Sequence, residues 1–470
     1  MIILSFCLCL LVFVAIGVLS VLKNHHTNVD YLIAGHSVRP WLVALSAVAT
    51  NNSGYMFVGM IGYTYMVGLS SVWLMVGWIV GDFIASLFIH KKLRIITQEQ
   101  GVLSFAGVLS QWHGNNYKLL RLIGGIITIV FLGTYAAAQL NAGSKALHTL
   151  FGWDYAAGAM IGAVMVVLYC VAGGIRASIW TDAAQSFVMF AAMAILCVVS
   201  INTVGGISEI SDALDEVSPS YMQLFPEATI VFPWLFIIGW VVAGFGVIGQ
   251  PHIMVRFMAM DQPKHMNKIR IYYYSWYIGF YCLTIMAGLA AKLLLPETTN
   301  FDAELALPAL AQLLLPEILV GLVLAGLFAA TMSTADSQIL SCTAAVTRDF
   351  TFGKKYSYLV TKLSTLLITL AALLIALYGS NSVFDLVLIA WSALACSFGP
   401  LLVLLTAGVR PSQTLSIITV ITGLAAMLLW RYFELNFLVY EVAPGMLAGF
   451  VPFMTYYGIT TIRRKVHRVL

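Results

Sequence analysis

Two short segments place polar groups and helix breakers inside otherwise apolar stretches of this sequence. Residues 50–55 read Thr-Asn-Asn-Ser-Gly-Tyr, and residues 244–252 contain three glycines and a proline. Both compositions predict a local break in a helix. The ends of broken helices offer free N–H groups to a carboxylate and free carbonyl oxygens to a cation. The two segments therefore predict a site for an anionic or zwitterionic solute beside a Na⁺ site, unless the glycines serve only packing and the proline only a kink.

A third polar segment, residues 331–338, reads Thr-Met-Ser-Thr-Ala-Asp-Ser-Gln. Ser333 and Ser337 are four residues apart, and Ser333 and Asp336 are three apart, so their oxygens share one helix face. An oxygen-rich cluster with an ionisable side chain suits a hard cation.

Two further acids lie at or inside apolar stretches. Asp182 follows Trp180 and Thr181, and we expect it at or near the cytoplasmic membrane boundary, either as a functional carboxylate or as an N-cap or interfacial acid. Asp82 follows a glycine and is either a buried functional acid or a helix-packing partner. The sequence leaves both choices open.

The composition shows which elements must position these groups. Of 470 residues, 61% are hydrophobic and 9% are charged, whereas an ordinary soluble domain carries roughly 25% charged residues. A bilayer core about 30 Å thick needs roughly 20 mostly apolar residues per helix, and the chain supplies many such stretches. The sequence thus predicts a single multi-pass domain, residues 1–470, with the lipid bilayer as partner. Nucleic-acid binding is not indicated, and no obligate protein partner is evident.

Thirteen membrane-spanning helices are predicted from apolar windows between charged or Pro/Gly-rich segments. They are 2–22, 40–67, 70–90, 120–149, 156–174, 179–204, 229–256, 269–294, 316–346, 358–378, 382–407, 413–430 and 438–461. The two predicted breaks fall in the second and seventh helices, five apart. Transporters built from two inverted five-helix repeats have discontinuous helices at corresponding positions, and the site forms where the breaks meet.

The basic residues agree with this count. Of the 24 Lys and Arg residues, only Lys145, Lys292 and Arg431 fall on one side of the predicted membrane. Because cytoplasmic loops collect basic residues, the N-terminus is expected outside and the C-terminus in the cytoplasm. The longest external segment, about 205–228, carries five acids and no base, and we expect a solvated surface loop there. Helix 2–22 lacks a cleavage signal and is expected to be retained.

Several motifs together resemble the sodium:solute symporter family, most closely its sodium/proline branch, with a partial similarity to the pantothenate branch. Their order and spacing agree along essentially the whole chain. The motifs are Ala44-Leu-Ser-Ala with Ser53-Gly54, Gly173-Gly174 with Trp180-Thr-Asp182 and Gln185, Gly249-Gln-Pro-His252 with Arg256-Phe-Met-Ala259, and Met332-Ser-Thr334 with Gln338.

The resemblance implies an all-α membrane protein of the leucine-transporter type, with inverted five-helix repeats. The leading helix would be 2–22, the core 40–407, and the two trailing helices would lie within 413–461, in agreement with the thirteen helices predicted from charge. It also implies Na⁺ as coupling ion. The implied Na⁺ ligands are Ala49, Asn52, Ala330, Ser333 and Thr334. Some relatives have a further Na⁺ site, which corresponds here to Asp182, Ser333, Asp336 and Ser337.

The resemblance also implies positions for a solute. These are Ser53, Gly54, Tyr55, Tyr135, Trp240, Gln250 and Pro251. The chain is about three residues longer than the proline symporters between Trp240 and Gln250, so Phe245 or Val247 is expected to line the pocket in place of Trp240.

The largest departure from the family is Asn51, which stands where proline symporters carry an aspartate important for Na⁺ coupling. Either Na⁺ binds more weakly, or another acid restores the charge. Asp336 is the expected compensator, because the proline branch has no acid there.

We therefore predict a Na⁺-coupled symporter of the plasma (inner) membrane that imports a small solute by alternating access, with no enzyme chemistry. An amino acid such as proline is the first expectation, and pantothenate or another carboxylate the alternative. A second class is a transporter-like sensor acting through a separate signalling partner. An intramembrane hydrolase is disfavoured, because neither H-E-x-x-H nor G-x-G-D occurs.

Overall fold

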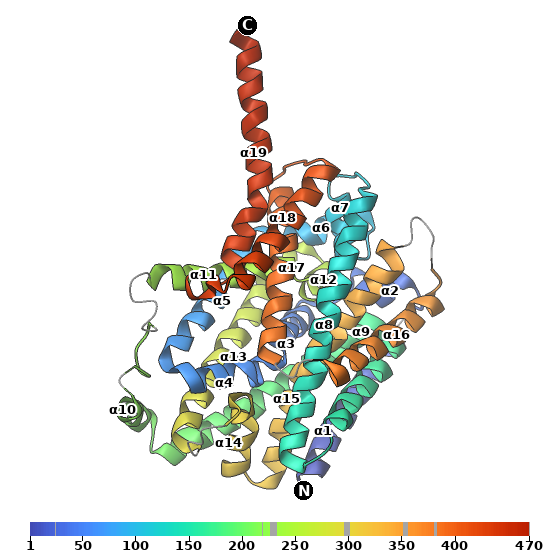
Figure 1. Cartoon of the computed structure of the whole chain (residues 1–470). Coiled ribbons are helices and arrows are strands. Elements are labelled where there is room, and N and C mark those ends of the chain that lie inside the picture. Colours follow the sequence, from blue (N-terminus) through green and yellow to red (C-terminus); the bar gives the residue numbers. More distant parts are fainter. Residues whose placement is uncertain are drawn as a thin grey trace.

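Helices make up nearly all of the described chain (Figure 1). The computed structural model describes residues 1–23, 25–218, 220–225, 233–295, 301–350, 356–379 and 383–469. The long helices are α1 (Ile2–Leu19), α3 (Pro40–Phe57), α5 (Val72–Phe88), α8 (Lys118–Phe151), α9 (Tyr155–Val204), α11 (Pro233–Phe245), α13 (Met266–Leu294), α15 (Glu317–Ala344), α16 (Tyr358–Tyr378), α17 (Val383–Thr406), α18 (Gln413–Tyr432) and α19 (Val442–Val469). The shorter ones are α2 (Asn28–Ile33), α4 (Gly59–Val67), α6 (His90–Gln100), α7 (Phe105–Gln111), α10 (Ile207–Val217), α12 (Pro251–Ala259) and α14 (Ala306–Leu314). Among these residues the β-type pairing is a single isolated bridge, Val38 to Met260, so the predicted all-α class is confirmed.

Most predicted helices correspond to one of these helices or to part of one, whereas 40–67 comprises α3 and α4, and 229–256 comprises α11 and most of α12. The predicted helices 156–174 and 179–204 are the two parts of α9, which turns at Gly174, where φ is +58°. A side chain at this glycine would also overlap the backbone of Tyr31 in α2. Glycine at this position therefore allows both the turn and the close approach of the two elements.

The number of membrane crossings remains a prediction. Nine described helices are long and apolar enough to span a membrane, or ten if α11 and α12, bent by 57°, form one span. One of the nine is α9, whose 50 residues would extend about 75 Å if straight, more than twice the thickness of a bilayer core. The turn at Gly174 therefore favours two crossings for α9.

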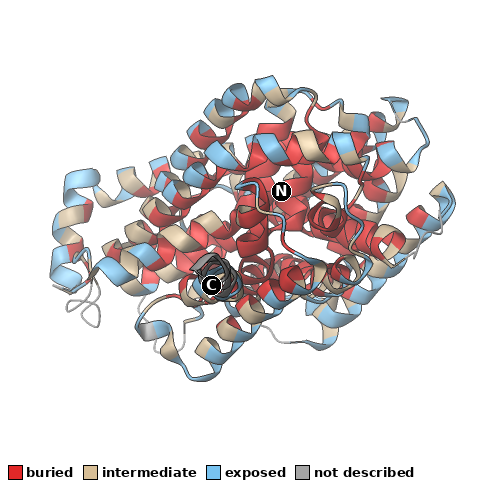
Figure 2. Cartoon of the chain, turned by 90° about the horizontal axis from the view of Figure 1, so that it is seen from above, coloured by how far each residue is buried: buried red, intermediate tan, exposed pale blue. Residues whose placement is uncertain are grey.

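Helix α15 forms the centre of the molecule, with every residue from Val323 to Ala344 buried. It packs against α9, α8, α3 and α1. Seen from above, buried faces line the interior and exposed faces point outward (Figure 2). Many outward side chains are large and apolar, as on α1 and α16, which is the pattern expected of a surface in contact with lipid.

Both predicted helix breaks are present. Ser53 has φ 51° and ψ −178°, which interrupts α3 one turn before its end. The second break separates α11 from α12 and consists of a short 3₁₀ turn, Gly246–Gly249, followed by extended Gln250. Pro251 then begins α12, where its missing N–H costs no helical hydrogen bond.

Small residues bring α5 and α11 together. A methyl group at Gly77 would lie 2.5 Å from Cβ of Trp240, and one at Gly81 would overlap the backbone of Val241. Gly244 packs in the same way against the backbone of Trp78. The two helices therefore touch backbone to backbone, as small residues allow in membrane bundles.

The structure corrects two expectations about charged segments. The acidic segment predicted as a loop contains helix α10, because Ile210 and Leu214, four residues apart, bury one face while the acids stay on the other. Arg256, counted with the cytoplasmic loops, is fully buried in α12. Glu227, Lys354 and Lys355 also entered the predicted topology and lie outside the described residues.

The termini lie at opposite ends of the molecule (Figure 1), and the predicted orientation can be tested by labelling. Asp215 on α10 and Lys264 before α13 are both exposed. In intact cells, a cysteine at Asp215 should react with a membrane-impermeant maleimide, and one at Lys264 should react only after lysis. The parent chain without the introduced cysteine is the control for the seven native cysteines. The opposite labelling pattern would reverse the topology.

Candidate functional site

The break in α3 faces the polar segment of α15. The Ser333 hydroxyl donates to the carbonyl oxygens of Ala330 at 3.0 Å and Ala49 at 3.3 Å. The Thr334 hydroxyl lies 3.0 Å from the carbonyl oxygen of Thr50 and 3.2 Å from that of Ala330. The structure thus brings together four of the five residues predicted to bind Na⁺.

Asn52, the fifth predicted Na⁺ ligand, is buried beside this group. Its amide nitrogen donates to the carbonyl oxygen of Val48 at 2.7 Å, and its Oδ1 has no hydrogen-bond partner within the described chain. Because Ser53 is not helical, the preceding carbonyl groups lose the regular helical pattern and can point toward α15. Buried carbonyl and hydroxyl oxygens at such a break can bind a hard monovalent cation.

The residues predicted for a second Na⁺ site surround an arginine. Nη2 of Arg256 lies 3.2 Å from Asp182 Oδ2 and 3.6 Å from Asp336 Oδ1, and it donates to Ser337 Oγ. It also donates to Ser178 Oγ at 2.6 Å. All these side chains are buried, so the described structure places a guanidinium charge where a second Na⁺ was expected.

This arrangement shows that Asp182 is not the N-cap or interfacial acid that the sequence left open. The carboxylate is fully buried inside α9 and accepts from the Ser46 hydroxyl at 2.6 Å. It is therefore neither an N-cap nor an interfacial acid, because it lies at the meeting point of α3, α9, α12 and α15.

The expectation that Asp336 compensates for Asn51 is not supported by this geometry. Asp336 is next to Arg256 and accepts from Ser178 and Ser337 at 2.9 and 2.8 Å. Asn51 instead contacts a different acid, since its amide nitrogen lies 3.3 Å from Asp82 Oδ2. The sequence did not indicate this neighbour, because it does not show how α5 packs against α3.

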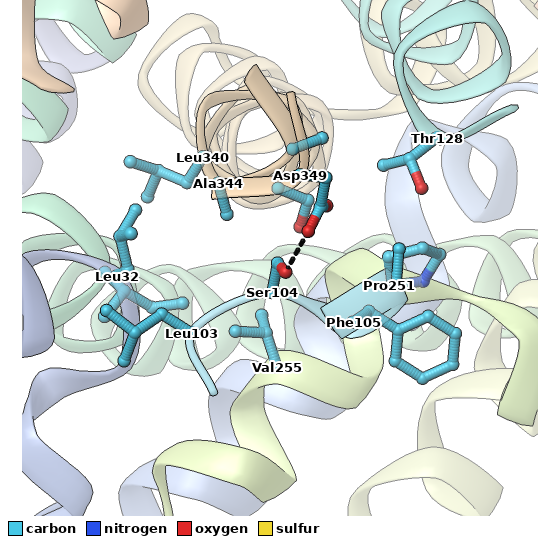
Figure 3. Close-up of a pocket in the computed structure, with 14 residues that line it drawn as sticks. Leu32, Leu103, Ser104, Phe105, Thr128, Pro251, Val255, Leu340, Ala344 and Asp349 are labelled. Atoms are coloured by element: carbon cyan, nitrogen blue, oxygen red, sulfur yellow. Dashed lines mark hydrogen bonds between the residues drawn. The ribbon is translucent and has the colours of Figure 1, made fainter. Parts of the chain in front are cut away.

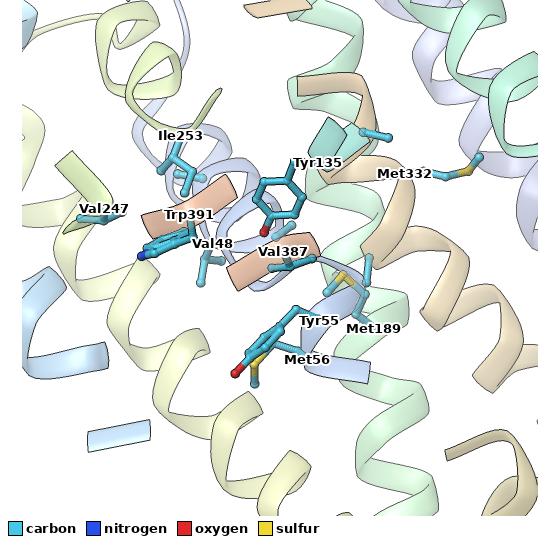
Figure 4. Close-up of a cluster of buried hydrophobic side chains, with 14 of the residues drawn as sticks. Val48, Tyr55, Met56, Tyr135, Met189, Val247, Ile253, Met332, Val387 and Trp391 are labelled. Carbon is cyan, nitrogen blue, oxygen red and sulfur yellow. The ribbon is translucent and has the colours of Figure 1, made fainter. Parts of the chain in front are cut away.

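A small enclosed cavity lies beside the α3 break. Of the predicted solute residues, Ser53, Tyr55 and Tyr135 line it. The other lining residues are Asn51, Asn52, Met56, Trp78, Tyr277, Tyr281, Val387 and Trp391. Figure 4 shows Tyr55, Tyr135 and Trp391 within one buried cluster. Several aromatic faces with a few polar groups are typical of a pocket for a compact solute.

The remaining predicted solute residues do not line this cavity. The Gly54 N–H donates to Gln139 at 2.8 Å, and the Gln250 amide donates to the carbonyl oxygen of Trp391 at 3.0 Å. Trp240 lies behind Trp78, with 6.0 Å between their ring centroids. Phe245 and Val247, the two expected replacements, are also absent from the cavity lining.

Pro251 lines a separate cavity between α12, α7 and α15 (Figure 3). There Ser104 donates to Asp349 at 2.5 Å, and Arg121 donates to the same carboxylate oxygen at 2.8 Å.

Sequence reasoning missed four aromatic residues of this cavity, Trp78, Tyr277, Tyr281 and Trp391, together with Met56 and Val387. Aromatic side chains are frequent in apolar helices, so their residue types give no signal that separates a pocket wall from a packing contact.

The sequence model of the sodium:solute symporter family matches residues 31–410. This chain belongs to the sodium:solute symporter family. The members of this family are Na⁺-coupled transporters and not enzymes.

Alignments with relatives cover nearly the full length of the symporter. The high-affinity proline transporter PutP of Bacillus subtilis is 30% identical over 437 residues, which cover 91% of this chain and 92% of the relative. The sodium/proline symporter of Escherichia coli is 27% identical over 469 residues, covering 96% and 92%.

Solved structures share its fold. A Na⁺-coupled sialic acid symporter in a substrate-bound, outward-open state has a TM-score of 0.78 at 19% identity and covers 96% of each chain. MhsT in complex with L-phenylalanine has a TM-score of 0.55 at 13% identity, covering 88% of this chain and 98% of that one. The predicted leucine-transporter-type fold is thereby confirmed.

The buried arginine leads to a prediction about stability. Arg256→Gln should lower the unfolding temperature of the purified symporter in detergent, because it leaves Asp182 and Asp336 without a cation. Removing one partner of a buried ion pair costs about 3–5 kcal/mol.

Two further variants make this test specific. Adding Asp336→Asn to Arg256→Gln should recover part of the loss, because one uncompensated carboxylate disappears. The exposed Lys264→Gln should behave like the parent protein. A double variant that is no more stable than Arg256→Gln would show that the ion pairs do not determine stability here.

Proposed function

We propose that the symporter imports a compact zwitterionic amino acid, with proline as the first candidate, and that an inward Na⁺ gradient drives this uptake. The observation that carries this proposal is the approach of Ser333 and Thr334 to the unwound part of α3, next to a small aromatic cavity. The names of the proline-transporting relatives support the choice of solute.

The geometry supports separate roles for the two groups of residues. Na⁺ would bind the oxygens of Ala49, Asn52, Ala330, Ser333 and Thr334. The solute would lie against Ser53, Tyr55 and Tyr135, with Trp78 and Trp391 enclosing its apolar part. Because both groups flank one break in α3, a bound Na⁺ would stabilise the backbone conformation that the solute requires.

Inward release would proceed past α12 and α7. The contacts of Asp349 with Ser104 and Arg121 join the start of α7, α8 and the π-helical turn Ala345–Asp349 that follows α15, beside the cavity of Figure 3. We propose that these contacts separate when the solute leaves. In the plasma membrane, with the N-terminus outside, each positive charge that crosses 100 mV contributes about 2.3 kcal/mol to uptake.

Uptake by proteoliposomes tests this function. Labelled amino acids and carboxylates, including proline and pantothenate, are offered with and without an inward Na⁺ gradient. Proline should accumulate only with the gradient. Pantothenate uptake in its place would correct the solute, and no accumulation of any solute would favour the sensor alternative.

The proposed Na⁺ site gives a second test. Ser333→Ala and Thr334→Ala should each raise the Na⁺ concentration for half-maximal uptake, by roughly tenfold, because the buried site has no water to replace the lost oxygen. Thr203→Ala is the matched control, since that exposed hydroxyl bonds only within its own helix at 2.8 Å to Val199. Unchanged Na⁺ dependence in both site variants would exclude the site on α15.

A further inference from the structure

A second group of oxygens surrounds Asp82, an acid that has no role in the proposed function. The carboxylate is fully buried on α5. Its Oδ2 accepts from the Tyr273 hydroxyl at 2.7 Å, and its Oδ1 accepts from the Tyr274 hydroxyl at 3.0 Å. The amide of Asn51 approaches Oδ2 at 3.3 Å. Three helices, α3, α5 and α13, thus converge on one carboxylate.

No basic side chain in the described structure forms an ion pair with Asp82. The nearest basic group on the facing helix is Arg270, one turn before Tyr274, and its guanidinium donates to Oγ and the backbone oxygen of Ser86. His90 on α6 stacks on Phe257, 3.9 Å between centroids. A buried ionised carboxylate needs either a proton or a nearby positive charge to offset the loss of water.

Asn51 provides an independent sign of a ligand. Its Nδ2 has three acceptors, Asp82, Tyr273 at 2.6 Å and Tyr277 at 3.3 Å, although it carries only two hydrogens. Its Oδ1 has no hydrogen-bond partner among the described residues, and the side chain is 7% exposed. The Asn51 amide therefore has more acceptors near its nitrogen than it has hydrogens to donate, and no donor near its oxygen in the described part of the chain.

A cation among these groups would resolve both imbalances. The carboxylate, the Asn51 amide oxygen and the tyrosine hydroxyls form a set of oxygen ligands suited to a hard cation. The amide oxygen would face the ion after a half-turn of the amide plane, and the hydroxyls would turn their lone pairs toward it.

We propose that Asp82, Asn51, Tyr273, Tyr274 and Tyr277 form a Na⁺ site separate from the one between α3 and α15. It rests on the proposed Na⁺-coupled uptake and adds a second coupling ion to it. Asn51 follows Thr50 on α3, and successive helix residues point about 100° apart, so the two sites lie on different sides of the same helix. The charge missing from Asn51 is supplied by Asp82.

The proposed site adjoins the solute cavity. Asn51 and Tyr277 each line that cavity and also belong to the group around Asp82. A bound ion would therefore fix two side chains of the pocket wall and present positive charge toward a solute carboxylate.

Equilibrium binding of radiolabelled Na⁺ to the full-length protein in lipid nanodiscs, without solute and at fixed pH, tests this site. The parent protein should bind two Na⁺ per chain. Asp82→Asn should bind one, with the affinity of the remaining site unchanged. Asp212→Asn, an exposed acid on α10, is the matched control and should bind two.

A second pair of variants covers the case in which Asp82→Asn does not fold. Tyr273→Phe should weaken one of the two sites by roughly tenfold or more, because it removes one oxygen ligand. Tyr272→Phe, whose side chain lies on the same helix and is 48% exposed, should leave both sites unchanged.

The outcomes separate this inference from the proposed function. If Asp82→Asn and Tyr273→Phe keep the number and affinity of Na⁺ ions, the Asp82 site is wrong, including the case in which Asp82 holds a proton. If the parent binds one Na⁺ that Ser333→Ala weakens and Asp82→Asn leaves intact, only the proposed function survives. A parent that binds no Na⁺ overturns both.

Discussion

The interior of a membrane offers no water to an unpaired peptide group, and this constraint governs the centre of the symporter. The α3 helix breaks at Ser53, and each backbone group there that loses its partner within the helix needs one from another helix. Gln139 of α8 accepts from the Gly54 N–H, and hydroxyls of α15 bond to the carbonyls of Ala49 and Thr50. The break is therefore stable only because α15 and α8 lie beside it.

Polar contacts extend from this break to a buried arginine. Thr50 lies 3.2 Å from Ser337, and Ser337 bonds to Arg256. The guanidinium then contacts carboxylates from α9 and α15. One continuous network of polar contacts thus joins both broken helices to the central helix. A displacement at the α3 break would therefore disturb the contacts of Arg256 in α12. Hydrogen-bond and ion-pair networks of this kind can carry energetic coupling between an ion and a solute.

The sequence predicted the helices and both breaks, because hydropathy, glycines and a proline act locally. It also indicated the residues of α15, since helical spacing places Ser333, Asp336 and Ser337 on one face. It failed where tertiary contacts decide. Arg256 was assigned to a cytoplasmic loop, although its guanidinium lies between two buried carboxylates, and α10 was predicted as a loop.

The contact between Asn51 and Asp82 was missed for the same reason. Asp336 was the nearest candidate by residue type, and only the packing of α5 against α3 and α13 revealed Asp82 in contact. The walls of the cavity beside the α3 break come from α3, α5, α8, α13 and α17, five separate segments of the chain. No local pattern could have assembled them.

The glycine contacts between α5 and α11 have a mechanical consequence. Gly77, Gly81 and Gly244 leave no side-chain layer in which one helix could slide along the other. We therefore expect α5 and α11 to move together during a transport cycle. Asp82 on α5 and the break that follows α11 would then keep their separation, and a rotation of the pair would change the distance between Asp82 and α3 instead.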